Sequence, residues 1–219
     1  MLASGRGSNL KALLAAIDAD PSFPGEVVVV AGDIADAGAI DIARDYGIAV
    51  AVQPVNAHDD RTAWEAALVE DLRAHQVEIV VLAGFMRIVS PAFLSHWPDR
   101  VINTHPSLLP AFRGAHAVRD ALAHGVKVTG ATVHFVIPEL DAGPIIAQHA
   151  VTVGEDDDEA TLHDRIRRAE HDLLPQVVRW MCEGRLRVEG DRVAIEPCDS
   201  DADIAEDSVP TADPDKDLS

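Results

Sequence analysis

The sequence predicts a single α/β domain: a mostly parallel, twisted sheet flanked by helices, with an antiparallel portion toward the C-terminal half. Three observations support this prediction. Apolar, β-branched runs at residues 27–31 and 78–84 are typical of strands buried on both faces of a sheet. Segments with helical periodicity separate these runs, which indicates β-α-β units with right-handed crossovers. The 219 residues are 47% hydrophobic and show no internal repeat, which suits one globular domain over residues 1–195.

The chain opens with a glycine-rich turn, Ser4-Gly5-Arg6-Gly7-Ser8-Asn9, that leads into an amphipathic helix. Only residues 1–3 precede this turn, too few for the strand that such a turn normally follows. We therefore expect either a stub in place of the first strand or a true start further upstream. Backbone N–H groups at a helix N-terminus bind anions, so a phosphate is the expected ligand of this turn. The alternative is a plain strand-to-helix turn with Ser8 or Asn9 as its cap.

The following elements alternate between strand and helix. The expected order in the first half is strand 27–31, helix 36–46, strand 48–52, helix 59–75, strand 78–84, segment 85–89 and a short helix from Ser90 to Trp97. The expected order in the second half is a strand that starts at Val101 and ends in a polar loop, helix 115–124, strand 128–137, loop 138–144, strand 145–153, helix 159–182 and a hairpin over 186–195. Strand 128–137 alternates apolar residues with Thr and His, which predicts one wetter face.

Composition excludes several classes of protein. The formal net charge of −19 argues against a nucleic-acid-binding face, because phosphate neutralisation needs clustered Lys and Arg. Residues 196–219 hold nine acidic residues against Lys216 alone, and we expect this tail to be disordered. No apolar run approaches the roughly 20 residues that span a bilayer, and no secretory pattern begins the chain. Cys182 and Cys198 have neither metal nor disulfide spacing, so we expect a cytoplasmic protein without a metal site.

The segment Val101-Ile102-Asn103-Thr104-His105-Pro106-Ser107-Leu108-Leu109-Pro110 has the pattern of a buried strand that ends in a rigid polar loop. At the carboxyl end of a strand in an open α/β sheet, such side chains face the crevice where ligands bind. Asn103 offers amide donors and acceptors, and His105 can donate, accept or carry a proton near neutral pH. Pro106 restricts the backbone directly after the imidazole. Taken alone, the segment fits a strand end with a satisfied surface histidine equally well.

Five motifs follow one another in a fixed order. They are Ser4-Gly5-x-Gly7-Ser8-Asn9-Leu10, Leu82-Ala83-Gly84-Phe85-Met86-Arg87-Ile88, Asn103-x-His105-Pro106-Ser107-Leu108-Leu109-Pro110, Gly130-Ala131-Thr132-Val133-His134 and Glu139-Leu140-Asp141-x-Gly143-Pro144-Ile145. Together they resemble the phosphoribosylglycinamide formyltransferase family over most of the chain. The resemblance implies a Rossmann-like formyltransferase fold. It also implies transfer of a formyl group from the co-substrate 10-formyltetrahydrofolate to the amine of glycinamide ribonucleotide, in purine biosynthesis.

The chemistry that this resemblance implies fits three side chains. A neutral amine attacks a formyl carbon, which creates an oxyanion and an ammonium that must lose a proton. We expect the Asn103 amide and a protonated His105 to stabilise the oxyanion. Asp141 beside His105 would favour the imidazolium and relay protons through water. The amine is itself the nucleophile, so neither a metal nor an acyl-enzyme is expected.

The resemblance also implies binding residues for each substrate. Those for glycinamide ribonucleotide are Gly7, Ser8, Asn9, Gly84, Pro106, Arg167 and Glu170. Those for the folate are Arg61, Met86, Arg87, Ile88, Val89, Asn103, Ile137, Pro138, Glu139, Leu140 and Asp141. An arginine can pair bidentately with the folate glutamate, and Glu170 could hold the amine or the ribose. Without the resemblance, Arg167 and Glu170 fit a solvated helix face, and the apolar residues of 86–89 fit plain core.

The chain departs from the family pattern at two places. Arg113-Gly114-Ala115 stands where the family often has Pro-Gly, and methionyl-tRNA formyltransferases carry a similar Arg-Gly-Ala. Val118 occupies a position where some members have a second histidine, so that histidine cannot be essential here. We expect supporting roles for His116 and His134, and His116 fits a purely structural role equally well.

Four alternatives share this scaffold or part of its pattern. A methionyl-tRNA formyltransferase would normally add a basic C-terminal domain, and a formyltetrahydrofolate hydrolase would add an N-terminal regulatory domain and need no phosphate turn. A non-catalytic folate- or nucleotide-binding module would not need Asn103, His105 and Asp141 together. A dinucleotide oxidoreductase would need a third glycine where Leu10 stands, although Asp33 ends the next strand. The expected partners are the two small-molecule substrates, with no nucleic acid or membrane, and a homodimer is left open.

Overall fold

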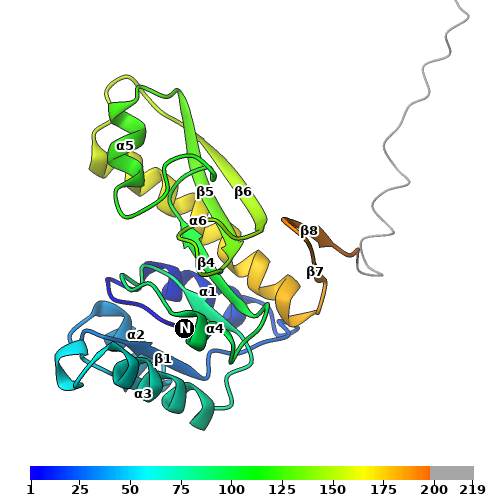
Figure 1. Ribbon diagram of the computed structural model, residues 1–219. Coiled ribbons are helices and arrows are strands. Elements are labelled where there is room, and N and C mark those ends of the chain that lie inside the picture. Colours follow the sequence, from blue (N-terminus) through cyan, green and yellow to red (C-terminus); the bar gives the residue numbers. More distant parts are fainter. Residues whose placement is uncertain (198–219) are drawn as a thin grey trace, which may run out of the picture.

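The computed structural model describes residues 1–197, and its helices and strands follow the predicted order (Figure 1). The helices in this range are α1 (Ser8–Ala19), α2 (Gly38–Asp45), the 3-10 helix η1 (Val55–Ala57), α3 (Arg61–Ala74), α4 (Pro91–Leu94), α5 (Ala117–Ala123) and α6 (Glu159–Cys182). The strands are β1 (Val29–Gly32), β2 (Ala49–Val52), β3 (Val80–Leu82), β4 (Val101–His105), β5 (Val128–Phe135), β6 (Ile145–Thr152), β7 (Leu186–Glu189) and β8 (Arg192–Ile195). Nearly all of the predicted tail, residues 198–219, lies outside the described range. None of the helices in residues 1–197 has the length and apolar character needed to cross a membrane.

The sheet is mixed, and its two halves differ in strand direction. Six strands lie in the order β3-β4-β5-β6-β8-β7, and β1 and β2 form a neighbouring parallel pair. β3 pairs parallel with β4, whereas the β4-β5 and β5-β6 pairs are antiparallel. The last two strands form the predicted hairpin. The predicted α/β class with an antiparallel C-terminal portion is therefore confirmed.

Residues 1–3 join the two groups of strands. Leu2 forms parallel bridges with Ala31 of β1 and with Leu82 of β3. Its N–H donates to the carbonyl oxygen of Val81 at 2.8 Å, and its side chain is fully buried. Residues 1–3 therefore occupy the position of a strand between β1 and β3. The glycine-rich turn therefore starts from a fixed point at the centre of the sheet.

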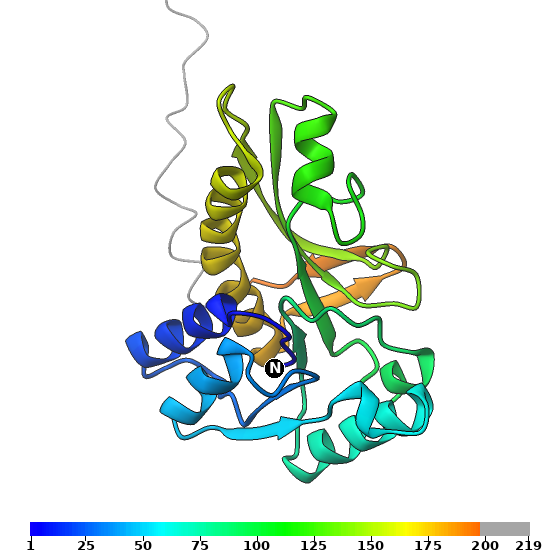
Figure 2. The ribbon, with the colours of Figure 1, turned by 90° about the vertical axis from the view of Figure 1, so that its left-hand side faces the viewer.

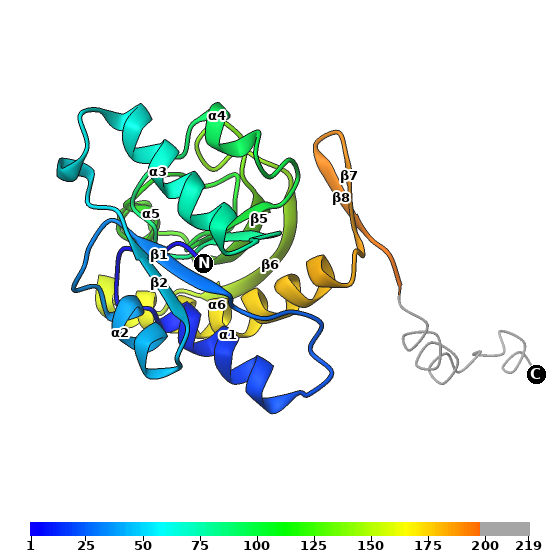
Figure 3. The ribbon, with the colours of Figure 1, turned by 90° about the horizontal axis from the view of Figure 1, so that it is seen from below.

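Helices cover both faces of the sheet and give a three-layer arrangement (Figures 2 and 3). α1, α2 and α6 lie on one face, and α3 and α4 lie on the other. Val30 and Val81 point into the first of these cores, whereas Val80 and Leu82 point into the second. Successive side chains of a strand face opposite sides, so strands covered on both faces must be apolar throughout. This explains the continuous apolar runs of β1 and β3.

The change from parallel to antiparallel pairing occurs at β4, and it determines which side chains meet. β4 runs through His105, so its polar residues belong to the strand itself. The register places Asn103 opposite His134, and His105 opposite Thr132. Residues directly opposite on neighbouring strands share one face of the sheet, with Cβ atoms about 5 Å apart. β4 therefore brings the polar end of one strand against the histidine of the next.

Candidate active site

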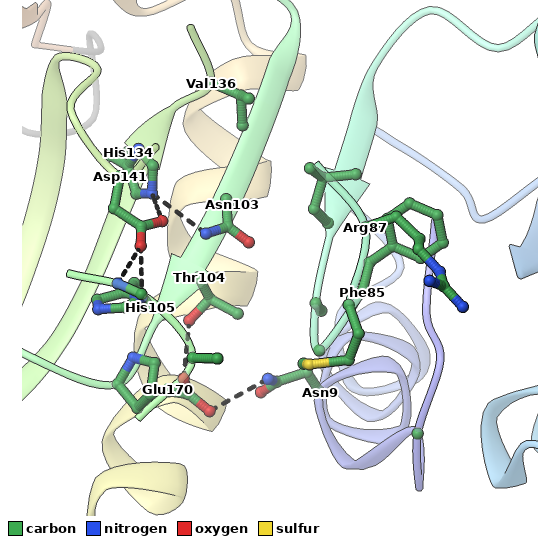
Figure 4. A pocket seen from close by; sticks show the side chains of 18 of the residues that line it. Asn9, Phe85, Arg87, Asn103, Thr104, His105, His134, Val136, Asp141 and Glu170 are labelled. Atoms are coloured by element: carbon green, nitrogen blue, oxygen red, sulfur yellow. Dashed lines mark hydrogen bonds and ion pairs between the residues drawn. The ribbon is translucent and has the colours of Figure 1, made fainter. Parts of the chain in front are cut away.

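A cavity of about 740 Å³ opens where β3 and β4 end, beside the start of α1 and the N-terminal half of α6 (Figure 4). Its wall comes from six segments: the glycine-rich turn, the end of β3 with the segment after it, the end of β4 with Pro106, residues 114–115, the end of β5 with its following loop, and α6. The predicted site residues that line it are Gly7, Ser8, Asn9, Gly84, Met86, Arg87, Ile88, Val89, Asn103, His105, Pro106, His134, Ile137, Glu139, Leu140, Asp141, Arg167 and Glu170.

The glycine-rich turn presents main-chain N–H groups to this cavity. Gly7 has a φ of +76°, and a Cβ there would lie 2.6 Å from the Cα of Ala39, so only glycine fits. α1 starts at Ser8, and no side chain caps it. The alternative cap by Ser8 or Asn9 is therefore not formed, and the first N–H groups of α1 lack a side-chain acceptor. A helix N-terminus in this state attracts an anion.

Asn9, Thr104 and Glu170 form a buried polar group at the same end of the cavity (Figure 4). Glu170 accepts hydrogen bonds from Asn9 Nδ2 at 3.2 Å and from Thr104 Oγ1 at 3.1 Å. Burial raises the pKa of Glu170, and these two hydrogen bonds only partly oppose the rise. The other amide atom, Oδ1 of Asn9, is buried without a partner. An unpartnered acceptor beside a buried carboxyl fits the hydroxyl or amine hydrogens of a ligand.

Basic side chains surround the start of α1. Arg6, His163 and Arg167 all line the cavity. Burial lowers the pKa of His163, the charges of Arg167 and Arg6 lower it further, and Glu159 opposes them. Arg167 also pairs with Asp164. In a chain of net charge −19, the two guanidinium groups of Arg6 and Arg167 beside a helix N-terminus suit a phosphate.

The contact between β4 and β5 fixes the tautomer of His134 and the orientation of Asn103. His134 Nδ1 lies 2.9 Å from the carbonyl oxygen of Phe135, which can only accept, so Nδ1 carries a proton. Burial lowers the pKa of His134, which favours the neutral ring. His134 Nε2 must then accept, and the atom that faces it at 3.2 Å is Asn103 Nδ2. Asn103 keeps a second N–H on that nitrogen for a ligand.

Asp141 lies between two histidines (Figure 4). Its Oδ1 is 3.7 Å from His134 Nε2, and its Oδ2 is 3.5 Å from His105 Nδ1. Both distances exceed the roughly 2.9 Å of a hydrogen bond, so the carboxylate lies close to both rings without bonding to either. The Gly114 N–H donates to Oδ2 at 2.8 Å and holds it there. Asp141 has a φ of +49°, a strained conformation that is frequent at functional sites. We call Asn103, His105, His134 and Asp141 the polar cluster.

Only one ring nitrogen of His105 makes a hydrogen bond. Its Nε2 lies 2.8 Å from the carbonyl oxygen of Phe112, and its Nδ1 faces Asp141. The sequence predicts a hydrogen bond from His105 to an oxyanion, whereas here Nε2 is engaged by the Phe112 carbonyl oxygen and Nδ1 faces Asp141. Asn103 is then the member of the polar cluster with a donor to spare.

The opposite wall of the cavity is the segment 84–89, which follows β3. Its Phe85 is buried in the core. Met86 and Ile88 are 68% and 54% exposed, although such residues are usually buried. Leu140, from the loop after β5, is 50% exposed beside the same cavity. We call these three exposed side chains the apolar rim, and their arrangement suits a flat hydrophobic ring system.

Three predicted residues do not line the cavity, and a fourth, Arg87, lines it with its charged group paired elsewhere. The guanidinium of Arg87 is directed away from the polar cluster and pairs with Asp33 at 2.7 Å (Figure 4). Arg61 lies on α3, outside the cavity, and donates to the carbonyl oxygen of Ile88. The remaining two are exposed and do not line the cavity: His116 and Pro138.

The cavity also contains residues that the sequence did not single out. Arg6, Thr104 and His163 are polar examples. His163 lies four residues before Arg167 on α6, and this spacing puts the two side chains on one face of the helix. His163 could therefore have been predicted from the helix assignment and the predicted role of Arg167. Residues 1–197 contain no group of three or more His, Cys, Asp or Glu that could hold a metal ion.

Comparison with known proteins agrees with this geometry. Residues 1–178 match the formyl transferase family. The phosphoribosylglycinamide formyltransferase of Mycobacterium tuberculosis (strain ATCC 25618 / H37Rv) is 47% identical over 190 residues, which make up 87% of this chain and 87% of that protein. Glycinamide ribonucleotide transformylase 1 from Symbiobacterium toebii has a similar crystal structure, with a TM-score of 0.87 and 47% identity, over 90% of this chain and 92% of that one.

A more distant similarity concerns the hydrolase alternative. The crystal structure of a formyltetrahydrofolate deformylase from Pseudomonas syringae gives a TM-score of 0.80 at 30% identity, over 90% of this chain but 65% of that one. Both kinds of enzyme therefore share the scaffold, and the identity with the transferases is higher. The resemblance to phosphoribosylglycinamide formyltransferases is confirmed, and the chain belongs to the formyl transferase family.

Proposed function

We propose that the protein transfers the formyl group of 10-formyltetrahydrofolate to the amine of glycinamide ribonucleotide. The products are formylglycinamide ribonucleotide and tetrahydrofolate, and the reaction belongs to purine biosynthesis. The observation that carries the proposal is a single cavity that joins an uncapped, cation-rich helix N-terminus to the polar cluster. An acceptor with a phosphate at one end and an amine at the other matches these two features.

The nucleotide end of the proposal uses the start of α1. The N–H groups of Gly7, Ser8 and Asn9 would bind the phosphate, with Arg167 supplying positive charge. The carboxyl of Glu170 and the free Oδ1 of Asn9 would accept hydrogen bonds from the ribose or the amine. Two further predicted residues border the same cavity and complete this end: Gly84 and Pro106.

The folate end of the proposal uses the opposite wall. The apolar rim would contact the pteridine, because exposed apolar side chains gain most from covering a flat ring. Arg61 is exposed and contacts the same segment through Ile88, so its guanidinium could reach the carboxylates of the folate glutamate. The lining residues that complete this end are Val89, Ile137 and Glu139, with Pro138 in the same loop.

The proposed reaction needs an oxyanion donor and a proton relay. The amine nitrogen bonds to the formyl carbon, the carbonyl oxygen becomes an oxyanion, and the resulting ammonium loses a proton. The spare N–H of Asn103 would stabilise the oxyanion, helped by the charge of His105. Asp141 would take the proton through water and return it to N10 of the folate as the carbon–N10 bond breaks. His134 has a supporting role, because it holds Asn103 in the donor orientation.

Hydrolysis of formyltetrahydrofolate is the second candidate, because a deformylase shares the scaffold. Water would then replace the amine as the nucleophile. The cation-rich start of α1 would have no ligand in that reaction, which favours the transferase.

The test is a spectroscopic assay of the purified protein with 10-formyltetrahydrofolate, with and without glycinamide ribonucleotide. Turnover that requires the nucleotide is the expected result. Turnover at an equal rate without it would identify a hydrolase. Tight folate binding with no turnover under either condition would identify a binding module.

A further inference from the structure

We propose that Asp33, acting through Ser4 and Arg87, is a positioning residue that ties the folate-binding segment to the phosphate-binding turn. The inference rests on the proposed function, because it names what holds the two substrate-binding parts of that site together. Asp33 directly follows β1 and does not line the cavity. Its role would therefore be to fix other residues and not to touch a substrate.

Three residues form a unit that we call the Asp33 hub: Ser4, Asp33 and Arg87. Ser4 Oγ donates to Asp33 Oδ1 at 2.7 Å, and Arg87 Nε donates to Asp33 Oδ2 at 2.7 Å. Ser4 Oγ also accepts from the N–H of Met86 at 3.2 Å. The Ser4 N–H donates to the carbonyl oxygen of Gly84 at 3.1 Å. Ser4 is the first residue of the glycine-rich turn, so one serine holds both substrate-binding parts.

The carboxylate of Asp33 is kept charged by its partners. Burial raises the pKa of Asp33, but the hydrogen bonds from Ser4 and Arg87 outweigh burial and hold this pKa below its usual value. The Asp33 side chain is 2% exposed, whereas that of Arg87 is 47% exposed. Each carboxylate oxygen has a donor, as a buried charge requires. Removal of either donor would leave the buried charge of Asp33 poorly compensated, so both hydrogen bonds favour the arrangement seen here.

The segment 84–89 is held at both ends, and its residues 86–88 are exposed. The Asp33 hub fixes the first end. Beyond the second end, the Ser90 N–H donates to Glu65 Oε1 at 2.9 Å, and Glu65 is itself buried. Met86 and Ile88 of the apolar rim therefore lie between these two held ends. Loss of Asp33 would release one end of the segment and leave the other end fixed.

The hub contacts the segment that would bind the folate, and the polar cluster that would carry out the chemistry lies on the other wall. Loss of the hub should therefore raise the KM for 10-formyltetrahydrofolate more than it lowers kcat. A general loss of folding would give a different result, because it reduces the amount of active protein and so lowers the apparent kcat at constant KM.

The test compares Asp33→Asn, Arg87→Leu and the double variant in the nucleotide-dependent assay, together with the Kd of tetrahydrofolate by calorimetry. Each single variant is expected to raise both the folate KM and this Kd about ten-fold. The double variant should be no worse than either single variant, because both substitutions remove the same ion pair. Asp71→Asn is the matched control: Asp71 accepts from Gln53 at 2.6 Å outside the cavity, and its variant should bind folate as the wild type does.

An unchanged folate Kd in Arg87→Leu would overturn the proposal, even if Asp33→Asn does not fold. Additive effects of the two substitutions would also overturn it, because Arg87 would then contact the folate independently of Asp33. A wild-type protein that binds tetrahydrofolate but shows no nucleotide-dependent turnover would refute the proposed function alone. The Kd comparison would still decide the role of Asp33 in that case.

Discussion

The parallel and antiparallel halves of the sheet contribute to the cavity in different ways. The parallel half consists of residues 1–3 with β1, β2 and β3. It contributes two loops that follow strands: the glycine-rich turn, after residues 1–3, and the segment 84–89, after β3. The antiparallel half contributes side chains that project from β4 and β5 themselves. Asn103 and His134 face each other in the register of these strands, and Asp141 joins them from the loop after β5.

This difference separates binding from chemistry in the proposed site. Loops after parallel strands offer main-chain N–H groups, whose positions depend on backbone conformation and not on side-chain identity. Opposed side chains of an antiparallel pair have fixed distances and bond to one another, so they can fix a tautomer and an amide orientation. We therefore expect substitutions in the parallel half to change substrate affinity, and substitutions in the antiparallel half to change the rate.

The largest effect is expected for Asp141, in the antiparallel half. Asp141→Asn keeps the side-chain volume but removes the negative charge beside His105. Turnover should fall by about 10²- to 10⁴-fold, the range of a general acid–base group. Steady-state kinetics measures the loss, and a thermal melt checks that the variant folds. Asp172→Asn, at an exposed position on α6, is the control; turnover near the wild-type rate in Asp141→Asn would remove Asp141 from the mechanism.

In the parallel half, Gly7 and Gly5 separate backbone conformation from side-chain chemistry. Gly7 has a φ of +76°, and a Cβ there would lie 2.6 Å from the Cα of Ala39, whereas a Cβ on Gly5 would meet nothing within 4 Å. Gly7→Ala should cost about 1–3 kcal/mol of unfolding free energy and raise the nucleotide KM about ten-fold. Gly5→Ala should be close to neutral. Urea unfolding and steady-state kinetics measure both quantities, and equal behaviour of the two variants would contradict the conformational role of Gly7.

Ser8 tests whether the phosphate contact is made by the main chain. Ser8→Asp puts a negative charge at the first residue of α1, where it should repel a phosphate and raise the nucleotide KM about ten-fold. Ser8→Ala keeps the N–H and should change this KM less than about three-fold. Kinetics with varied nucleotide at saturating folate measures the difference. A loss in Ser8→Ala as large as in Ser8→Asp would mean that the hydroxyl, and not the backbone, makes the contact.

The parallel half was also easier to predict from the sequence, because its signals are local. Buried apolar runs fix β1 and β3, and a glycine such as Gly7 shows where the backbone turns. The partnership of Asp33 with Arg87 could not be predicted in this way, since 54 residues separate the two. The sequence suggested for Asp33 only a part in a dinucleotide fingerprint, and the fold gives it a different environment.

For the antiparallel half, the sequence identified candidate residues but not how their side chains are arranged. The sequence identified Asn103, His105 and Asp141 at the end of a strand and in a loop. It could not show that Phe112, with a φ of +53°, turns its carbonyl group onto His105. It also could not show which atom of Asn103 faces His134, because that depends on the register of β4 and β5.

The smallest effect is expected in the pH dependence of stability, and it arises from His134. Burial lowers the pKa of His134 below its ordinary value of 6.5. As the pH falls below 6.5, the unfolded chain takes up a proton at this position while the native ring stays neutral. The native state therefore loses stability as the pH falls toward the native pKa. His134→Gln cannot take up that proton, so its unfolding free energy should fall less steeply than that of the wild type as the pH drops below 6.5.

Urea unfolding at several pH values measures this slope in both proteins. Burial also lowers the pKa values of His163 and His171, so the slope should be reduced and not abolished in His134→Gln. An identical slope would mean that the native His134 ring takes up its proton over the same pH range as the unfolded chain does. Its Nε2 would then donate, and the Asn103 amide would have to turn its oxygen toward the ring. That reversal would move the amide N–H groups that the proposed oxyanion contact requires. The pH dependence of stability therefore tests whether Asn103 can donate the hydrogen bond to the oxyanion.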